Sequence, residues 1–372
     1  MKIVLATGTY YPQIGGPALL VKELAAELKK RGHEPLVLTY SEQVQVETEP
    51  FKVVRIYRSF KLLNYFKYFA AVLKNVSAGD QAVVFDNFSA ALPVAVAGLF
   101  KKIPFVVRLG GDFLWETAVN KFGKQVTLED YYKTRFSLTE VFYYLLIRFI
   151  FRRAKKLLAT TAYQQSLIEE HYHIRREKFY LLPNAFPQVS SQDYKIVRKK
   201  QLLFAGRFTK IKNLTRLIEA MAKLKHQDYQ LILAGEGPEE ENLRLRIKEL
   251  ALTDRVIIKP KVFGPELDAL IKESKWLVLP SLSDISPNLV FKSIALGTPV
   301  LMTQHSGLHE IFAKHLFFIK YPLHPEELLA KLDFLLSLDD DHYASVLRAL
   351  TKIDRSYGFK ELVDRFLLLI NL

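Results

Sequence analysis

The sequence predicts an α/β protein built from two doubly wound parallel-sheet domains. The first reason is length, because 372 residues are enough for about two domains. The second is order, because short apolar runs alternate with helical patterns along the chain. The third is composition: 49% hydrophobic and 25% charged residues, with 16 Gly and 16 Pro, exclude disordered, collagen-like and low-complexity proteins.

The first domain starts with a strand, a turn and a helix. Residues 3–6 form a short apolar run, Gly-Gly-Pro follows at 15–17, and leucines then recur at helical spacing until Arg31-Gly32. Pro17 suits the first turn of a helix. Further buried strands are predicted at 35–39, 53–56, 82–85 and 104–107. This alternation predicts a parallel sheet that is covered on both faces.

A second cycle of strands and helices begins at residue 201. Its predicted strands are 201–205, 230–234, 255–258, 276–280 and 299–302, and its predicted helices are 213–225, 239–250, 265–273 and 288–296. Residues 183–198 contain two Pro and no clear period, which places a hinge near 186–200. We therefore expect domains at 1–190 and 191–354 and an amphipathic C-terminal helix within 355–372. A cleft between two such sheets, at the carboxyl ends of strands, is the expected active site.

The first loop with possible chemistry follows the predicted strand 201–205. Arg207 and Lys212 place two cations beside the amides of a helix N-terminus, an arrangement that suits a diphosphate. Gly206 allows a sharp turn at the end of the strand. A solvated basic loop is the alternative interpretation.

The second loop, 280–288, follows the predicted strand 276–280 of the same domain. Asp284 can accept hydrogen bonds from sugar hydroxyls there. Ser286 or Asn288 can equally be a simple N-cap of the following helix.

The third loop is 303–310, after the last predicted strand of the cycle. Gly307 can expose backbone amides to an anion. His305 and His309 are four residues apart, but no third ligand stands near and Gly307 would interrupt a helix between them, so the sequence disfavours a metal site.

These three loops occur together and in this order, and in this the chain resembles the retaining nucleotide-sugar-dependent glycosyltransferases of the GT-B fold, in particular glycosyltransferase family 4 (group 1). The likeness covers most of the chain. In the second domain it rests on Gly-Arg-x4-Lys-x4-Leu-Ile-x-Ala at 206–220, Leu-Ala-Gly-x-Gly-Pro at 233–238, Leu-Pro-Ser at 279–281, Pro-Asn at 287–288 and Ala-Leu-Gly-Thr-Pro-Val at 295–300. In the first domain it rests on Tyr-Pro-x-x-Gly-Gly at 11–16, Lys-Arg-Gly-His-Glu at 30–34, Gly-Asp-Phe-Leu-Trp-Glu at 111–116 and Phe-Gly at 122–123.

The resemblance implies two Rossmann-like domains that face a central cleft, with the C-terminal helix packed back on the first domain, and it implies roles for particular residues. Arg207 and Lys212 would hold the donor diphosphate and stabilise the departing nucleotide without a metal ion, and Asp284 would bind donor-sugar hydroxyls; these three are the expected catalytic residues. The other expected donor-binding residues are Gly16, Gly206, Asn288, Lys292, Gly307, Leu308 and Glu310. The candidates on the acceptor side are Asp112, Trp115 and Glu116.

Two positions depart from the family pattern. Lys292 stands eight residues after Asp284, where the family's second carboxylate usually contacts the ribose. A cation cannot accept hydrogen bonds from ribose hydroxyls, so nucleoside recognition differs, or Lys292 approaches phosphate, or activity is impaired. The family's first domain also often carries a His before Asp112, whereas this chain has residues 108–111 without one.

The function implied by the resemblance is transfer of a sugar from a nucleotide-diphosphate sugar, such as a UDP- or GDP-sugar, to a glycan or lipid-linked acceptor with retained configuration. Such enzymes serve cell-envelope polysaccharide or glycolipid biosynthesis, and no cofactor is expected. Two alternatives remain: a nucleotide-sugar 2-epimerase of related fold and a degenerate sugar-nucleotide-binding protein. The Arg-x4-Lys spacing favours the transferase.

The positive charge is concentrated in the first half. Residues 51–156 hold 18 Lys/Arg against 7 Asp/Glu, whereas residues 191–372 hold 27 against 23. Basic residues mixed with aromatics at 55–69 and 142–156 suit an anionic membrane surface, although a packed helix with a basic solvent face would look the same. No nucleic-acid-binding signature is present, so nucleic acid is not an expected partner.

The expected location is the cytoplasm, with peripheral contact to the inner face of the cell membrane. The chain has no Cys, which excludes disulfide scaffolds and thiolate metal sites and fits a reducing compartment. Residues 1–9 do not look like a signal peptide, and no stretch reaches the roughly 18–20 unbroken apolar residues of a spanning helix.

Overall fold

The computed structural model describes residues 1–11, 16–42, 49–189 and 198–371, which form two compact units. The first unit comprises residues 1–114, 135–183 and 360–372. The second unit comprises residues 115–134 and 184–359. The units follow the contacts that the chain makes, whereas the expected domains follow chain order, and the expected boundary at 190/191 stays a prediction.

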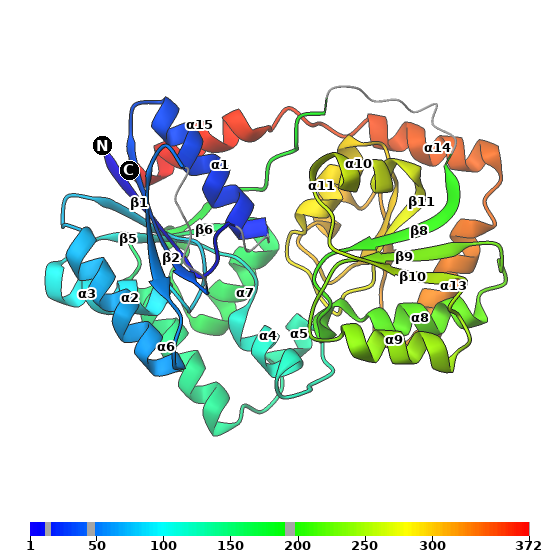
Figure 1. Cartoon of the computed structure of the whole chain (residues 1–372), viewed down its shortest axis with the longest axis horizontal. Coiled ribbons are helices and arrows are strands. Elements are labelled where there is room, and N and C mark those ends of the chain that lie inside the picture. Colours follow the sequence, from blue (N-terminus) through cyan, green and yellow to red (C-terminus); the bar gives the residue numbers. More distant parts are fainter. Residues whose placement is uncertain (12–15, 43–48, 190–197, 372) are drawn as a thin grey trace. The chain divides into compact units, whose positions relative to one another are not determined.

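The first unit is built on a seven-stranded parallel sheet with the strand order β3-β2-β1-β4-β5-β6-β7 (Figure 1). Its strands are β1 (Lys2–Thr7), β2 (Glu34–Ser41), β3 (Lys52–Tyr57), β4 (Gln81–Val84), β5 (Phe105–Arg108), β6 (Lys156–Ala159) and β7 (Phe179–Leu181). Its helices are α1 (Gly16–Lys30), α2 (Lys61–Asn75), α3 (Ala91–Lys101), α6 (Leu138–Arg153), α7 (Ala162–Tyr172), the short η1 (Arg176–Lys178) and α15 (Phe359–Asn371), which belongs here from Lys360 on.

The C-terminal helix α15 is tied into the first unit by polar and aromatic contacts. The ammonium of Lys156 donates to the Leu369 carbonyl at 2.7 Å, and Arg31 pairs with Asp364. The buried ring of Phe366 also faces the buried core of this sheet.

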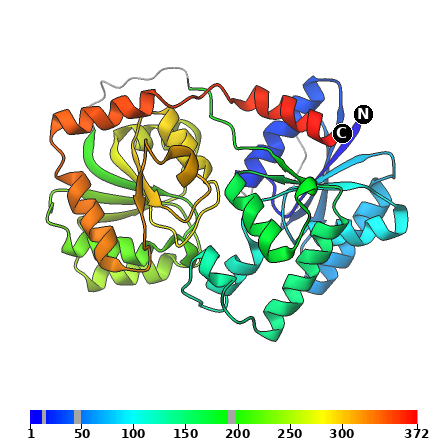
Figure 2. The same ribbon diagram turned by 180° about the vertical axis from the view of Figure 1, so that it is seen from behind.

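The second unit is built on a six-stranded parallel sheet with the order β10-β9-β8-β11-β12-β13 (Figure 2 shows it from behind). Its strands are β8 (Lys199–Ala205), β9 (Gln230–Ala234), β10 (Val256–Lys259), β11 (Ser274–Leu279), β12 (Val300–Thr303) and β13 (Phe317–Ile319). Its helices are η2 (Lys210–Lys212), α8 (Leu214–Lys223), α9 (Glu240–Glu249), α10 (Gly264–Glu273), α11 (Asn288–Ala295), α12 (His309–Phe312), α13 (Pro325–Leu336) and α14 (Asp340–Thr351).

Residues 115–134 leave the first unit and pack in the second. They contain most of α4 (Phe113–Asn120) and the short helix α5 (Leu128–Tyr131). Leu128 and Tyr131 are fully buried, and the segment is grouped with the second unit by its contacts.

The predicted α/β class with two parallel sheets is confirmed, and every strand predicted from the sequence is present within one or two residues. The strands are buried runs of Val, Leu and Ile, as expected for sheets with both faces covered. Within the ranges that the structure describes, no helix has the length and apolar character needed to cross a bilayer.

Candidate active site

The loops that follow β8 and β11 lie at the point where the second sheet changes direction. β8 pairs with β9 on one side and with β11 on the other, so the chain order reverses between β8 and β11. In open α/β sheets, ligands bind beyond the carboxyl ends of the strands at such a switch point. The topology thus singles out the loops with the three expected catalytic residues.

Lys212 and Asp284 form an ion pair that joins these two loops. Lys212 Nζ lies 2.5 Å from Asp284 Oδ2, and the two side chains are 22% and 15% exposed. The Ser281 hydroxyl lies 3.5 Å from the same carboxylate oxygen. The backbone adds a second link, because the Leu282 amide donates to the Ile211 carbonyl at 2.9 Å. The sequence therefore brings an ammonium and a carboxylate together at the switch point.

Arg207 lies on the same loop as Lys212, but its side chain is exposed. Among the residues that the structure describes, its guanidinium has no hydrogen-bond or ion-pair partner. The loop backbone beneath it is fixed, because the Phe208 amide donates to the Glu236 carbonyl at 2.8 Å. The β9 loop approaches so closely that a Cβ on Gly235 would lie 1.9 Å from the Gly206 carbonyl oxygen. Arg207 thus presents a cation, unpaired within the described part of the chain, on a loop whose backbone is hydrogen-bonded to the loop after β9.

The loop after β12 is bonded to the loop that carries Asp284. The Asp284 amide donates to the His305 carbonyl and the Gly307 amide to the Ile285 carbonyl, each at 3.0 Å. The Leu308 amide donates to the Ser306 hydroxyl at 3.1 Å. The two amides expected to contact the donor are therefore engaged within the chain, and a phosphate would have to share or replace these bonds.

Lys292, the residue in place of the usual second carboxylate, forms an ion pair with Asp268. Its ammonium lies 2.5 Å from a carboxylate oxygen of Asp268 on α10, and both side chains are partly exposed. Asn288 begins α11 and Glu310 lies on α12, and both are exposed. Their expected donor contacts stay predictions.

The expected residues of the first half lie at the ends of helices. Gly16 is the first residue of α1, and the preceding loop 12–15 lies outside the described residues. Asp112 and Glu116 flank the start of α4 and are partly exposed. Trp115 is 3% exposed, and its indole N–H donates to the Val126 carbonyl at 2.9 Å, so a contribution of Trp115 to an acceptor site would be indirect.

His305 and His309 do not face one another. Both ring nitrogens of His305 already have partners, since Nδ1 lies 2.6 Å from Glu129 Oε2 and Nε2 lies 3.0 Å from the Lys320 carbonyl oxygen. The ring of His309 instead lies edge-on to Phe318. The two imidazoles therefore have different partners in the structure.

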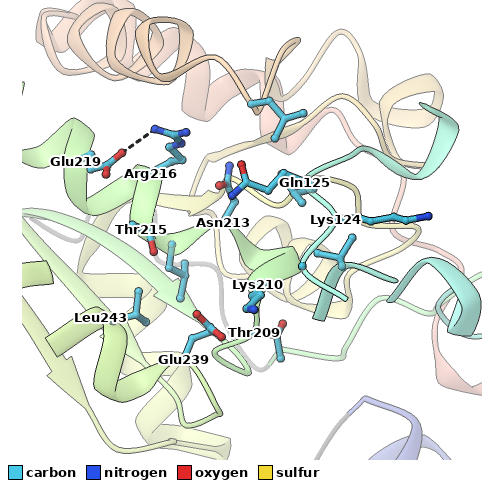
Figure 3. Close-up of a pocket in the computed structure, with 15 residues that line it drawn as sticks. Lys124, Gln125, Thr209, Lys210, Asn213, Thr215, Arg216, Glu219, Glu239 and Leu243 are labelled. Atoms are coloured by element: carbon cyan, nitrogen blue, oxygen red, sulfur yellow. Dashed lines mark hydrogen bonds and ion pairs between the residues drawn. The ribbon is translucent and has the colours of Figure 1, made fainter. Parts of the chain in front are cut away.

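A cavity of about 380 Å³ lies beside the loop that follows β8, within the second unit (Figure 3). Thr209 and Lys210 of that loop line it, together with Arg216 and Glu219 of α8, which form an ion pair. The side chain of Lys124 extends away from the cavity in Figure 3. The three expected catalytic residues do not line it.

Two family models match the chain in succession. Glycosyltransferase Family 4 matches residues 14–187, and Glycosyl transferases group 1 matches residues 188–348. The chain belongs to these glycosyltransferases. It is therefore an enzyme, and nothing in the comparisons supports the epimerase alternative.

Similar proteins agree with this family. The chain is 22% identical to the alpha-monoglucosyldiacylglycerol synthase of Streptococcus pneumoniae over 85% of its own length and 74% of the relative's. WaaG, a glycosyltransferase involved in lipopolysaccharide biosynthesis, has a similar structure with a TM-score of 0.77, 18% identity and 99% of both chains covered. Anabaena HepE in complex with UDP and glucose gives a TM-score of 0.73 at 17% identity, over 100% of this chain and 99% of the other. The GT-B fold predicted from the sequence is confirmed.

The glycosyltransferase also contains contacts at its site that the sequence did not reveal. Leu128 and Glu129 of α5 reach Ser283 and His305, which neighbour Asp284 in the loops after β11 and β12. The one available sequence signal was the pattern Thr127-x-x-Asp130, an N-cap signature that starts α5.

Proposed function

We propose that this glycosyltransferase moves a hexosyl group from a nucleotide-diphosphate sugar to a glycan or lipid-linked acceptor, with retention of configuration and without a metal ion. The observation that carries the proposal is the Lys212–Asp284 pair at the switch point of the second sheet, with the cation of Arg207, which no described residue pairs with, on the same loop. The cations suit the diphosphate and the carboxylate suits sugar hydroxyls.

The chemistry follows from the charge that develops on the leaving group. As the bond between the anomeric carbon and the phosphate oxygen breaks, the sugar gains oxocarbenium character and the diphosphate gains negative charge. Fixed cations near the diphosphate oxygens stabilise that state more than the ground state. Arg207 and Lys212 supply two positive charges, which is the electrostatic role that a divalent ion would otherwise have.

The proposed donor is a UDP- or GDP-sugar, and the proposed acceptor belongs to a cell-envelope glycan or a glycolipid. The complex of HepE with UDP and glucose supports a uridine donor. The name of the pneumococcal relative indicates a lipid acceptor, and that of WaaG indicates an envelope polysaccharide.

Exposed apolar side chains on helices of the first unit support the proposal of a lipid-linked acceptor. Helices α2, α3 and α6 are neighbours in this unit (Figure 1). Neither α2 nor α3 contains an acidic residue, and each has one lysine in its last turn, Lys74 and Lys101. Together with Phe60, which precedes α2, the three helices expose these large apolar side chains: Phe60, Leu62, Leu63, Phe66, Leu99, Phe100, Leu138, Val141, Phe142 and Leu145. We propose that this surface binds an anionic bilayer from the cytoplasmic side.

Donor turnover, measured with and without acceptor, tests the proposed reaction. A panel of nucleotide sugars is first screened by thermal shift, because a ligand that binds only the folded state raises Tm. A transferase releases nucleotide faster when acceptor lipid or glycan is added. Conversion of the donor sugar to an isomer without acceptor would instead show an epimerase, and binding without any conversion would show a binding protein.

Vesicle flotation tests the membrane surface separately. We expect binding to vesicles with anionic lipid, reduced by salt, and little binding to neutral vesicles. Replacing Phe60 and Phe66 by Ser should weaken it, whereas Leu245→Ser on α9 of the second unit, also an exposed apolar residue, should not. Equal flotation of the two variants would refute this surface but leave the reaction untouched.

A further inference from the structure

The excursion of residues 115–134 is bonded to the loop that carries Asp284. The Leu128 amide donates to the Ser283 hydroxyl at 2.8 Å, and that hydroxyl donates in turn to the Leu282 carbonyl at 2.8 Å. Ser283 is 1% exposed. One buried hydroxyl therefore joins the start of α5 to the residue directly before Asp284.

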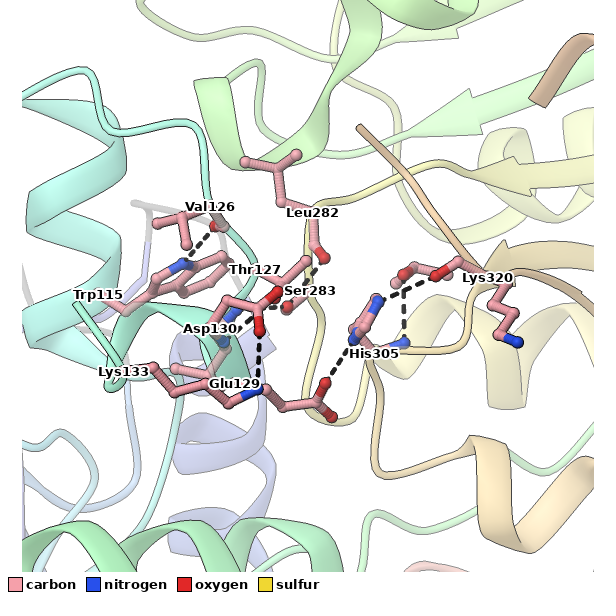
Figure 4. A network of polar contacts seen from close by, with 12 residues as sticks. Trp115, Val126, Thr127, Glu129, Asp130, Lys133, Leu282, Ser283, His305 and Lys320 are labelled. Atoms are coloured by element: carbon pink, nitrogen blue, oxygen red, sulfur yellow. Dashed lines mark hydrogen bonds and ion pairs between the residues drawn. The ribbon is translucent and has the colours of Figure 1, made fainter. Parts of the chain in front are cut away.

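A second bond, one residue further along α5, reaches the neighbouring loop. The carboxylate of Glu129 lies 2.6 Å from Nδ1 of His305, and Nε2 of His305 lies 3.0 Å from the Lys320 carbonyl oxygen (Figure 4). A carboxylate and a carbonyl can only accept hydrogen bonds. With Glu129 ionised, each ring nitrogen donates only if it carries a proton, so this geometry favours the imidazolium form of His305.

The backbone transmits this arrangement to Asp284. The His305 carbonyl accepts the Asp284 amide, and two residues later the Gly307 amide donates to the Ile285 carbonyl. The side chain of His305 is 15% exposed, so the ring is held between α5 and the segment after β13. A shift of His305 would therefore release one of the two bonds that hold the backbone around Asp284.

We propose that His305, held as an imidazolium between Glu129 and the Lys320 carbonyl, is a positioning residue that fixes Asp284 and fastens residues 115–134 to the active-site loops. The proposal deepens the proposed function, on which it depends for the role of Asp284. The attachment of the segment itself is independent of any reaction.

The surroundings of His305 favour its charged form. Burial acts to lower the pKa of His305, but the hydrogen bond and charge of Glu129, the Lys320 carbonyl and the charge of Asp130 outweigh it, and the net pKa is raised. Further charged groups beside α5 are Lys133, which pairs with Asp130 at 2.8 Å, and Lys124, whose ammonium lies over the ring of Tyr131. The His305 carbonyl accepts a hydrogen bond from the Asp284 amide, and the side chain of Asp284 is paired with Lys212.

The position of Lys320 is also fixed. Its amide donates to one carboxylate oxygen of Glu327, and the Tyr321 amide donates to the other, both at 2.6 Å. The carbonyl that receives Nε2 of His305 therefore belongs to an anchored segment. We call the two hydrogen bonds of the His305 ring, to Glu129 and to the Lys320 carbonyl, the His305 clamp. Because the pKa of His305 is raised, the clamp is complete below the ordinary His pKa and is lost as the pH rises through the folded-state pKa.

The first test is an NMR titration of the free enzyme labelled at histidine, with the His305 signal assigned from His305→Asn. We expect His305 to titrate above its ordinary pKa, and Glu129→Gln to lower that value. The matched control is His342→Asn, which removes a largely exposed pair with Asp339 at the start of α14 and should leave the His305 titration unchanged. An ordinary pKa for His305, or no response to Glu129→Gln, would overturn the proposal.

The second test is hydrogen–deuterium exchange at neutral pH, without substrate. Charge-assisted hydrogen bonds of this kind change an opening equilibrium by about tenfold to a hundredfold. We expect faster deuterium uptake by about this factor in residues 115–134 of His305→Asn and Glu129→Gln, and unchanged uptake there in His342→Asn. Unchanged uptake in all three variants would refute the clamp, whether or not the enzyme transfers sugar.

The third readout is the pH profile of donor turnover. In the wild type, kcat/KM should fall on the alkaline side with the pKa found by NMR. His305→Asn should have kcat/KM lower by about tenfold and lack this limb, while Glu129→Asp, which keeps the carboxylate, should retain it. A wild-type limb that persists unchanged in His305→Asn would overturn the positioning role. Absence of turnover with every donor would count against the proposed function alone, because the NMR and exchange results stand without it.

Discussion

Replacing Lys212 by Ala separates the catalytic role of the Lys212–Asp284 pair from its structural role. The substitution leaves the Asp284 carboxylate, only 15% exposed, without its cation. A hydrogen bond between charged groups contributes about 1.5–3 kcal/mol, and water can replace part of it because Lys212 is 22% exposed. We therefore expect a loss of about 1–2 kcal/mol in the free energy of unfolding, or about 2–8 °C in Tm.

The expected loss of activity is larger than this loss of stability. Removing one fixed donor to a developing oxyanion lowers turnover roughly 100–1000-fold, and the variant still folds at 25 °C. The assay is nucleotide release at saturating donor, beside thermal unfolding of the same sample. Lys210→Ala is the control, since Lys210 lies on the same short helix η2 and is exposed. Turnover of Lys212→Ala within about threefold of wild type, or an equal loss in Lys210→Ala, would refute the catalytic role.

Three further substitutions test the packing and the charges around the sheets. Gly235→Ala should destabilise the second unit by about 1–3 kcal/mol in urea unfolding because its Cβ would overlap a backbone carbonyl, whereas Gly79→Ala, with open space around it, should have little effect. Lys292→Glu should lower stability by about 1 kcal/mol because it places a carboxylate against Asp268, and a rise in donor affinity would show that the missing carboxylate can be restored. Burial raises the pKa of Asp86 despite hydrogen bonds from backbone amides and Ser89 that lower it, so the wild type loses stability as the pH rises from the ordinary Asp pKa through the raised one; urea unfolding of Asp86→Asn should lack this pH dependence.

The strands were predictable because each long buried strand is an apolar run that turn residues delimit. The strands that the sequence analysis did not assign are β6, β7 and β13, which have three or four residues each. Such short segments contain at most two repeats of the two-residue strand period, too few to indicate a strand on their own, and the residues of β7 and β13 are mostly half-buried. Pairing with neighbouring strands, not local sequence, makes these segments extended.

The site was predictable at the level of loops but not of side-chain contacts. The order of strands and the position of Arg207, Lys212 and Asp284 after them could be read along the chain. The direct Lys212–Asp284 pair depends on the rotamers of two residues separated by 72 positions. The Glu129–His305 pair joins residues 176 positions apart, and no local sequence pattern predicts it. Sequence reasoning treated His305 only as a weak metal ligand, because a lone His carries no information about its partner.

The ion pair between Lys212 and Asp284 has a consequence for the proposed donor. In the free enzyme each of these two groups satisfies the charge of the other at a site that is largely shielded from water. A diphosphate that takes Lys212 removes the cation from Asp284 and places a second anion nearby, which is unfavourable unless other donors replace it. Sugar hydroxyls are such donors. In the proposed reaction a nucleotide that carries its sugar satisfies both groups at once, whereas the nucleotide product leaves Asp284 unpaired, so the pair itself favours binding of the donor and release of the product.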